Sequence, residues 1–385
     1  MTARPIVIAA GGTGGHFIPA EALARALAAR GHAIALMTDR RAGERGHGIF
    51  AEGPQFVLPG AGIAGHGLAR RAGAALALAR GTRQARAILR RLDALAVVGF
   101  GGYPSVPPLL GARLLGKDRP LIFLHEGNAV LGQANKALAR FADGIATSFA
   151  RVAGLPAHAH PEPTGMPVRD DIAALHATPY IPPGDAIRLL VWGGSLGARV
   201  FSDVVPDAIG RLPAGLRARL RVTQQARAED IDRVRAAYDA LGIRATLSPF
   251  FSDVAALLAA AHLVVGRAGG SSVAELTNAG RPAILVPLPI AAGDEQGANA
   301  AALVQEGAAW MIRQPGFTAA ALAERLQALL SDPASLADAA RAARGLARPD
   351  AARRFADLIE ARIAERLHRT PRPAYPTAAK TETPA

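Results

Sequence analysis

The chain has 385 residues, enough for two domains of ordinary size that each bury a hydrophobic core. It contains no cysteine, which excludes disulfides and thiolate metal sites and favours a reducing cytoplasm. Its formal net charge of +13 favours anionic partners, whereas an aromatic content of 5% disfavours single-stranded nucleic acid, so we predict a phosphorylated substrate or an anionic membrane surface and no nucleic acid.

A β-α-β unit is predicted at the start of the chain. Its parts are a strand at 6–10, the loop Gly11-Gly12-Thr13-Gly14-Gly15-His16, a helix at 19–30 and a strand at 33–37. A nicotinamide-dependent oxidoreductase is one alternative, with Asp39 at the ribose, but its GxGxxG pattern requires a third glycine where Phe17 stands. His16, where the loop enters its helix, is a candidate catalytic residue, and a structural histidine is the alternative.

Residues 68–92 are predicted to form a helix in which leucine and isoleucine side chains are edged by arginines. Such a helix can rest on anionic headgroups, where each basic side chain contributes ~1 kcal/mol. The alternative is a helix packed on the core with a solvated arginine face. No apolar run reaches the ~18 residues that span a bilayer, and the start of the chain does not resemble a signal peptide, so neither a membrane span nor secretion is predicted.

Two further strands of the first half end in loops suited to ligands. The strand at 96–100 leads to Gly101-Gly102-Tyr103, and the strand at 121–124 leads to His125-Glu126-Gly127-Asn128. In open α/β sheets, ligands lie outside the carboxyl ends of the strands, so these loops and that of His16 are expected to form the floor of a cleft. The proline-rich segment 154–168, closed by Arg169, is predicted to link two domains.

The second half repeats the opening pattern, with a strand at 189–192, the glycine loop 193–198 and a helix. We therefore predict an α/β fold of two Rossmann-like domains whose parallel sheets face one another across a groove. Phe251 follows another strand and is predicted either to stack on a base or to lie in the core. Asp230 and Asp232 have the Asp-x-Asp spacing of metal-dependent glycosyltransferases, but the surrounding arginines and alanines indicate a solvated helix surface.

The stretch 262–299 carries the most informative pattern. After a buried strand, Gly269 and Gly270 let the backbone approach a ligand, and Ser271 and Ser272 are predicted to cap the next helix. A helix start behind glycines offers N–H groups and a positive dipole end, which suit a diphosphate. Glu275, one turn further, is placed to accept hydrogen bonds from ribose hydroxyls.

The next strand delivers a polar cluster that suits a ligand with many hydroxyls. Its members are Asp294, Glu295, Gln296 and Asn299. The stretch therefore predicts a nucleotide-sugar site. The alternative is an ordinary strand, turn and helix in which glycine and serine only cap the helix.

Taken in order, these motifs resemble those of the MurG family of peptidoglycan N-acetylglucosaminyltransferases. The matches are Gly11–His16 to its GGTGGH loop, Gly101–Tyr103 to its GGY loop, Gly193–Ala198 to its GGSxGA loop, and Gly269–Glu275 with Gln296-x-x-Asn299 to its donor site. Together they cover nearly the whole chain. The resemblance implies the GT-B fold, in which the last helix packs back on the first domain, and neither a metal nor a cofactor.

With this resemblance, four regions are expected. They are an acceptor-binding, membrane-associated domain at 1–168, a UDP-sugar-binding domain at 169–347, the returning helix at 348–368, and a disordered tail at 369–385 that is rich in proline and threonine.

The reaction that the resemblance implies moves N-acetylglucosamine from UDP-N-acetylglucosamine to the 4-hydroxyl of the muramoyl sugar of undecaprenyl-pyrophosphoryl-muramoyl-pentapeptide. It inverts the anomeric centre and takes place at the cytoplasmic face of the bacterial inner membrane. A single displacement needs a base for the acceptor hydroxyl and stabilisation of the departing UDP. His16 is the candidate base, and Glu126 is the second choice.

The residues that the resemblance assigns to substrates fall into two sets. The donor contacts are Thr13, Gly14, Gly15, Asn128, Arg169, Ser195, Phe251, Gly270, Ser271, Ser272, Val273, Ala274, Glu275, Gln296 and Asn299. The loops for the acceptor pyrophosphate contain Gly11, Gly12, Gly101, Gly102 and Tyr103.

Four positions depart from the family's pattern. They are Gly127 and Leu196, where glutamine is usual, Met166, where asparagine is usual, and Glu295, where a neutral residue or histidine is usual. Of these, Met166 and Glu295 bear on individual contacts near the sugar and the linker. Two further alternatives are another GT-B glycosyltransferase with a lipid acceptor and a noncatalytic nucleotide-sugar-binding protein.

Overall fold

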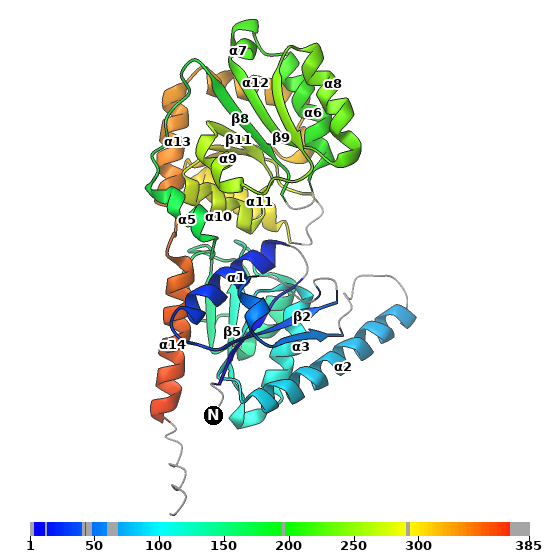
Figure 1. Cartoon of the computed structure of the whole chain (residues 1–385), viewed down its shortest axis with the longest axis vertical. Coiled ribbons are helices and arrows are strands. Elements are labelled where there is room, and N and C mark those ends of the chain that lie inside the picture. The colour runs from blue at the N-terminus through cyan, green and yellow to red at the C-terminus, as the bar shows by residue number, and fades with distance from the viewer. Residues whose placement is uncertain are drawn as a thin grey trace, which may run out of the picture.

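The chain folds into two α/β domains stacked along one long axis, and its last helix runs from the second domain down the side of the first (Figure 1). The computed structural model describes residues 4–11, 14–40, 43, 48–59, 68–194, 197–289 and 293–369, the side chains of 68–71 excepted. The predicted contacts of Gly12, Thr13 and Ser195 lie outside the described residues. So does the predicted tail 369–385, except for Arg369, which is not in a tail but at the end of the last helix.

The first domain is built on a parallel sheet in the order β3-β2-β1-β4-β5-β6-β7. The strands are β1 (Ile6–Ala9), β2 (Ile34–Asp39), β3 (Gln55–Leu58), β4 (Ala96–Gly99), β5 (Leu121–Glu126), β6 (Gly144–Thr147) and β7 (Pro161–Glu162). The helices are α1 (Gly14–Ala28), α2 (Leu68–Leu92), α3 (Gly102–Arg113) and α4 (Gln133–Leu138). The central strands are continuous apolar runs because helices cover both faces of the sheet.

The second domain repeats this plan with a parallel sheet in the order β10-β9-β8-β11-β12-β13. The strands are β8 (Ile187–Trp192), β9 (Leu220–Gln225), β10 (Arg244–Ser248), β11 (Leu263–Gly266), β12 (Ala283–Leu285) and β13 (Ala309–Met311). The helices are α5 (Asp170–Ala174), α6 (Arg199–Gly210), α7 (Ala214–Arg219), α8 (Ile231–Ala240), α9 (Val254–Ala260), α10 (Gly270–Ala279), α11 (Glu295–Gln305), α12 (Ala319–Leu330) and α13 (Pro333–Gly345).

Both sheets have the strand order of nucleotide-binding Rossmann folds, with the first strand in the middle and the third at the edge. The order reverses between β1 and β4 in the first domain and between β8 and β11 in the second. Ligands of such sheets bind at the carboxyl ends of the strands beside this reversal. The predicted fold of two Rossmann-like domains with parallel sheets is confirmed.

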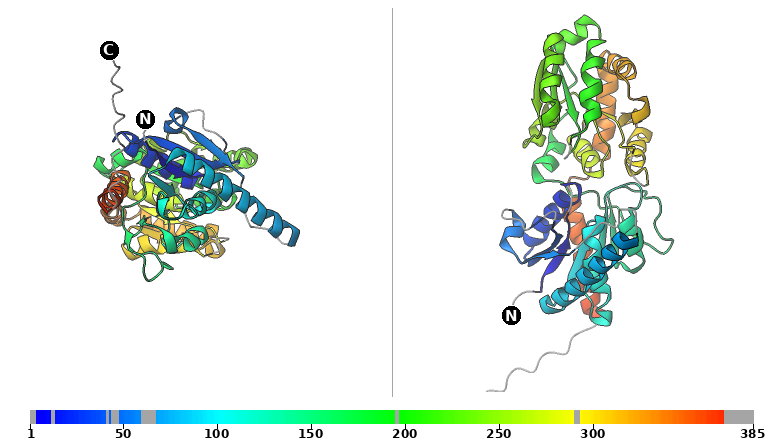
Figure 2. Two further views of the ribbon diagram at one scale, coloured as in Figure 1. Left: turned by 90° about the horizontal axis from the view of Figure 1, so that it is seen from below. Right: turned by 90° about the vertical axis from the view of Figure 1, so that its right-hand side faces the viewer.

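The last helix, α14 (Ala351–Arg369), packs on the first domain although it follows the second domain in sequence (Figures 1 and 2). Phe355 and Ile359 are completely buried among core residues of the first domain. At the surface, Arg30 of the first domain forms ion pairs with Asp357 at 2.8 Å and Glu360 at 2.6 Å. The C-terminal helix therefore contributes to the core beneath the first domain's loops.

The chain crosses between the domains twice, and the crossings touch at Gly165. This residue has a φ of +91°, which favours glycine, and a Cβ there would lie 2.5 Å from Arg348 Cβ. Gly165 is therefore required both by its backbone conformation and by the close approach of the returning chain.

Candidate active site

His16 lies in the first turn of α1, because this helix begins at Gly14, earlier than the predicted start at 19. Its ring lies against the loop that follows β4. A Cβ built on Gly102 would be 3.4 Å from His16 Cε1, and one built on Gly101 would be 3.7 Å from His16 Nε2. Both glycines have positive φ, so the loop needs them to turn beside the ring. Tyr103 follows in the first turn of α3.

The loop after β1 contacts helix α3. A Cβ on Gly11 would lie 3.0 Å from Pro104 Cγ of α3. Two of the loops predicted to hold the acceptor pyrophosphate are therefore brought together around His16.

Burial lowers the pKa of His16 below its ordinary value of 6.5. The imidazole is therefore neutral near pH 7, which is the state that a general base requires.

The neighbouring His125 is a structural residue. Burial lowers its pKa to about 4. Its ring stacks near Phe100 and Phe355, with centroid distances of 5.3 and 5.8 Å, and its Nε2 lies 3.3 Å from the carbonyl oxygen of Gly165. His125 thus packs the floor of the site against α14.

Glu126, the second candidate base, is held by four donors. Its Oε1 accepts hydrogen bonds from the backbone N–H of Asn128 at 3.0 Å and from Asn128 Nδ2 at 3.2 Å. Its Oε2 accepts from the Gly132 N–H at 2.9 Å and from Asn135 Nδ2 at 2.8 Å. A carboxylate has about four lone-pair sites, so little capacity is left for a substrate proton. The geometry assigns Glu126 to anchoring the β5–α4 loop.

Helix α10 begins at Gly270, and its N-cap is Gly269, with no side-chain cap. The prediction that Ser271 and Ser272 cap this helix is therefore wrong, since both lie inside the first turn. Ser271 Oγ instead donates a 3.0 Å hydrogen bond to the carbonyl oxygen of Gly15 in the first domain. An uncapped helix start leaves backbone N–H groups for an anion, and here it lies beside the first turn of α1, which carries His16.

Glu275 follows in α10 with 5% of its surface exposed. Burial raises the pKa of its carboxyl to about 7; the guanidinium of Arg169 opposes this shift and Asp171 adds to it. Arg169 precedes α5 and lies 3.5 Å from Asp171. Val273 and Ala274 share the first turns of α10, where Val273 is buried. Burial destabilises the ionised form of this carboxyl group, and ligand hydroxyls that donate hydrogen bonds to it would stabilise that form.

Gln296 joins the ends of two strands of the second domain. Its Oε1 accepts from the backbone N–H of Ala268 at 3.2 Å and of Leu288 at 3.0 Å. Its Nε2 would be 3.9 Å from a Cβ on Gly269, next to the start of α10. The amide nitrogen is thus on the side where a donor sugar is expected.

Asn299 has a different environment from the one predicted. It is completely buried and forms three hydrogen bonds, with Asn128, Ala129 and Ala268. The prediction that Asn299 contacts the donor does not fit this geometry, because no part of its side chain is accessible.

The glycine loop after β8 is held by a residue that was not predicted from the sequence. Gln225, at the end of β9, accepts a 3.1 Å hydrogen bond from the Gly193 N–H and donates one of 3.1 Å to the Pro249 carbonyl oxygen. It therefore ties the glycine loop to the segment of Phe250, which is 69% exposed, and Phe251, which is partly buried. Its position at the carboxyl end of a strand beside the glycine loop was the available signal.

Asp230 is not the solvated residue that was predicted. It is buried and pairs with Arg233 at 2.9 Å, and Arg233 also pairs with Asp203. Within the described part of the chain, no three histidine or acidic side chains come together as metal ligands.

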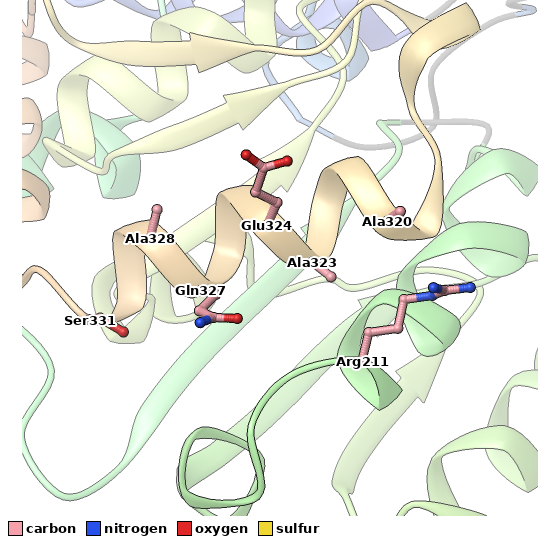
Figure 3. A pocket seen from close by; sticks show the side chains of 7 residues that line it. All are labelled: Arg211, Ala320, Ala323, Glu324, Gln327, Ala328 and Ser331. Carbon is pink, nitrogen blue, oxygen red and sulfur yellow. The ribbon is translucent and has the colours of Figure 1, made fainter.

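A shallow depression on the second domain lies apart from these residues (Figure 3). It is lined by Arg211, at the end of α6, and by one face of α12. Arg211 and Glu324 are its charged members, and the rest of the lining consists of alanines, Gln327 and Ser331. None of the predicted site residues lines it.

The protein has two Rossmann-type sheets, and its last helix returns to the first domain. The uncapped start of α10 meets the first turn of α1, which carries a histidine. These features define the GT-B class of nucleotide-sugar glycosyltransferases. Comparison with known proteins narrows this class. The glycosyltransferase family 28 N-terminal domain matches residues 6–147, and the glycosyltransferase family 28 C-terminal domain matches residues 188–359. The chain belongs to glycosyltransferase family 28.

Its similarity to individual proteins extends over nearly its whole length. A protein of Gluconobacter oxydans, named UDP-N-acetylglucosamine–N-acetylmuramyl-(pentapeptide) pyrophosphoryl-undecaprenol N-acetylglucosamine transferase, is 62% identical over 94% of this chain and 99% of that protein. A protein of the same name from Granulibacter bethesdensis is 59% identical over 93% of each chain. The crystal structure of Acinetobacter baumannii MurG has a TM-score of 0.74 and 28% identity, covering 93% of this chain and 99% of that one.

The fold itself is shared more widely. The calicheamicin glycosyltransferase CalG4 superposes with a TM-score of 0.64 at 17% identity, over 94% of this chain and 99% of that one, a likeness of fold alone.

Proposed function

We propose that this protein transfers N-acetylglucosamine from UDP-N-acetylglucosamine to the muramoyl sugar of undecaprenyl-pyrophosphoryl-muramoyl-pentapeptide. The relatives from Gluconobacter and Granulibacter carry the name of this reaction. The observation that most supports the proposal is the hydrogen bond between Ser271 and Gly15, which joins the start of α10 to the first turn of α1, where His16 lies. It sets a diphosphate-binding element beside a neutral histidine.

The chemistry follows from these two elements. Neutral His16 removes the proton of the acceptor hydroxyl as that oxygen attacks the anomeric carbon, and the bond to UDP breaks on the opposite face, so the configuration inverts. The N–H groups and dipole at the start of α10 stabilise the negative charge that develops on the departing diphosphate. Both roles need the two domains to be in contact.

Donor binding is proposed for residues around that helix. Glu275 accepts from the ribose hydroxyls, Gln296 Nε2 donates to the sugar, and the exposed Phe250 and the adjacent Phe251 flank the base. Gly14, Gly15, Asn128 and Arg169 complete the donor set, with Gly270 to Ala274 around the diphosphate. The acceptor pyrophosphate is assigned to Gly11, Gly101, Gly102 and Tyr103.

The domain boundaries at 168 and 347 are proposed as the hinge of this enzyme. Support comes from the meeting of the two crossings at Gly165 and Arg348. Motion between the domains would bend the chain there and leave both sheets intact.

We place the membrane contact on the first half of α2, and with it a peripheral location on the cytoplasmic face of the inner membrane. This half extends beyond the first domain (Figures 1 and 2) and carries Leu76, 51% exposed, and exposed Arg80. Exposed Arg83 follows at the start of the second half. The second half packs on the domain through buried Ile88 and Leu89, so there the alternative of a core-packed helix holds. None of the described helices is long and apolar enough to cross a membrane.

The membrane contact is tested by flotation with liposomes that contain or lack anionic lipid. Binding to anionic liposomes is expected to fall in the double variant Arg80→Glu/Arg83→Glu. Equal partitioning of the wild-type protein into both kinds of liposome would remove this assignment.

The reaction is tested by transfer of labelled sugar from UDP-N-acetylglucosamine to a lipid-linked muramoyl-pentapeptide analogue. Diacylglycerol is offered in parallel as a different lipid acceptor, and NAD as a different nucleotide. Transfer to the muramoyl analogue supports the proposal. Transfer only to diacylglycerol, binding of UDP-N-acetylglucosamine without turnover, or binding of NAD but not of UDP would each replace it.

A further inference from the structure

The side chain of Asn299 spans the two domains. From α11 it donates hydrogen bonds to Asn128 Oδ1 at 3.0 Å and to the Ala268 carbonyl oxygen at 2.9 Å, and its Oδ1 accepts from the Ala129 N–H at 2.8 Å. Asn128 and Ala129 belong to the β5–α4 loop of the first domain, whereas Ala268 follows β11 of the second. One fully buried amide therefore binds both domains and uses both of its N–H groups.

The side chain of Asn128 is in turn fixed at both ends. Its Nδ2 donates to Glu126 Oε1 at 3.2 Å, and its Oδ1 accepts from Asn299. One N–H and one oxygen lone pair remain on this partly exposed amide. That combination suits hydroxyl groups, which both donate and accept.

Because the hydrogen bonds of Asn299 are buried, they restrict how the two domains can be placed relative to one another. A shift of one domain against the other that keeps water out would leave the Ala129 N–H and the Asn299 amide without these partners, and an unpaired buried polar group is costly. The Ser271 to Gly15 bond is exposed, so water can replace it. Among these interdomain bonds, those of Asn299 specify one relative position of the domains.

We propose that Asn299 is a positioning residue, an interdomain clasp that holds the domains together and orients the Asn128 amide toward the donor sugar. It acts through Asn128 and does not touch the ligand. The part of the inference that concerns the orientation of Asn128 rests on the proposed function, because that orientation affects activity only if a sugar nucleotide binds there. The clasp itself depends on the three hydrogen bonds alone.

Kinetics separate this role from simple loss of stability. Asn299→Ala is expected to lower kcat/KM for UDP-N-acetylglucosamine by about 10-fold or more, the effect of one buried hydrogen bond. The inhibition constant of UDP, which lacks the sugar, is expected to change less than about threefold. Asn299→Asp is expected to behave like Asn299→Ala, because a carboxylate accepts from Ala129 but cannot donate to Asn128.

The matched control is Asn278→Ala, another buried asparagine of the second domain, whose Nδ2 donates to the Ala274 carbonyl oxygen within α10. It destabilises the domain without reaching the interface. It is expected to shift the constants for UDP and for the sugar nucleotide by the same factor. The same uniform shift in Asn299→Ala would reduce Asn299 to a stability residue and overturn the proposal.

A double-mutant cycle tests whether Asn299 acts through Asn128. The double variant Asn128→Ala/Asn299→Ala is expected to be within about twofold of the worse single variant, because removing Asn128 already removes what Asn299 orients. Losses that multiply would show that the two residues act independently and would overturn the proposal.

Domain contact is measured without any substrate. The chain has no cysteine, and a Cβ on Gly293 would lie 3.8 Å from Val130 Cγ1 of the other domain, so Val130→Cys/Gly293→Cys forms a single reporter pair. Oxidation is expected to close this disulfide about 10-fold more slowly when Asn299→Ala is added. An unchanged rate would overturn the clasp. If the wild-type protein binds no UDP and transfers no sugar, the proposed function fails, while this rate still decides whether the clasp exists.

Discussion

The end of the Met166 side chain occupies the space beside Gly127, where a Cβ built on Gly127 would lie 2.7 Å from Met166 Cε. Met166 is buried in a core cluster of the second domain, and its Cε would also lie 3.1 Å from a Cβ on Gly270. Two of the positions that depart from the family's pattern therefore touch one another at the start of α10. Their volumes are complementary, since the missing side chain at 127 leaves room for the longer apolar one at 166.

The first prediction concerns this pair. Gly127→Ala is expected to lower the free energy of unfolding by about 1 kcal/mol, because the added methyl group overpacks the buried Met166 terminus. In a Met166→Ala background, the same change is expected to cost less than about 0.5 kcal/mol, since the space is then empty. Urea unfolding of the four proteins measures the coupling. An equal cost in both backgrounds would show that the two residues do not interact.

A second prediction follows from Gly270. A Cβ at this position would run into the carbonyl oxygen of Gly127, a backbone atom of the other domain that no rotamer change can move. Gly270→Ala is therefore expected to lower transfer at least about 10-fold by forcing the domains apart. Gly269→Ala is the matched comparison, because its nearest contact would be Gln296 Nε2 at an ordinary 3.9 Å. If both variants lose activity equally, the clash is not the cause.

Much of the fold and the site's location could be predicted from local pattern. A buried strand followed by a glycine loop is typical of a Rossmann unit. The order of the loops at Gly11, Gly101, Gly193 and Gly269 therefore predicts two Rossmann-like domains, one after the other along the chain. The start of α1 was misplaced because Pro19 suggests a first helical turn, although this proline is inside the helix. The sequence predicts where such helices and strands lie but not the residues at which they begin and end.

The role of Glu126 could not be predicted, because it depends on how the loop after β5 folds around the carboxylate. The role of Asn299 could not be predicted, because it depends on partners distant in sequence. Asn299 bonds Asn128 from 171 positions away. In the sequence it is only one more polar residue after a strand, and the same is true of Gln225. A polar residue at the carboxyl edge of a sheet either faces a ligand or braces a loop, and only the three-dimensional neighbours decide between these roles.

A third prediction tests whether Glu126 anchors the β5–α4 loop or acts as the general base. Glu126→Gln keeps the size of the side chain but replaces one acceptor oxygen with an NH₂ group, which faces N–H donors such as those of Gly132 and Asn135. The variant is expected to lose about 1–3 kcal/mol of stability through unsatisfied or repelling donors. Its dependence of kcat/KM on pH is expected to keep the acid limb of the wild type. Disappearance of that limb would restore Glu126 as the base.

The fourth prediction concerns His16. His16→Ala is expected to lower kcat by about 10²–10⁴-fold, the usual contribution of a general base, with a small change in donor KM. Glu275→Ala is expected to act mainly on donor KM, since it removes a binding contact. The burial that lowers the pKa of His16 sets the acid limb of kcat/KM below pH 6.5. A wild-type kcat in His16→Ala would remove this residue from the mechanism.

The last prediction uses the pKa of Glu275, which burial raises from 4.5 to about 7. Well below pH 4.5, folded and unfolded chains both hold the proton. As the pH rises toward 7, the unfolded chain releases it first, so stability falls with pH across this window, by about 3 kcal/mol at 1.36 kcal/mol per pKa unit. Glu275→Gln removes the titrating group and is expected to become more stable than wild type as the pH rises from 5 to 8, as urea unfolding would measure. Glu275→Ala leaves a cavity, so its free energy of unfolding is lower than that of the wild type at pH 5. The difference between the two is nevertheless expected to change with pH by the same slope as for Glu275→Gln. Parallel curves for wild type and both variants would mean that Glu275 is ionised throughout, and that its burial places no demand on the ribose hydroxyls.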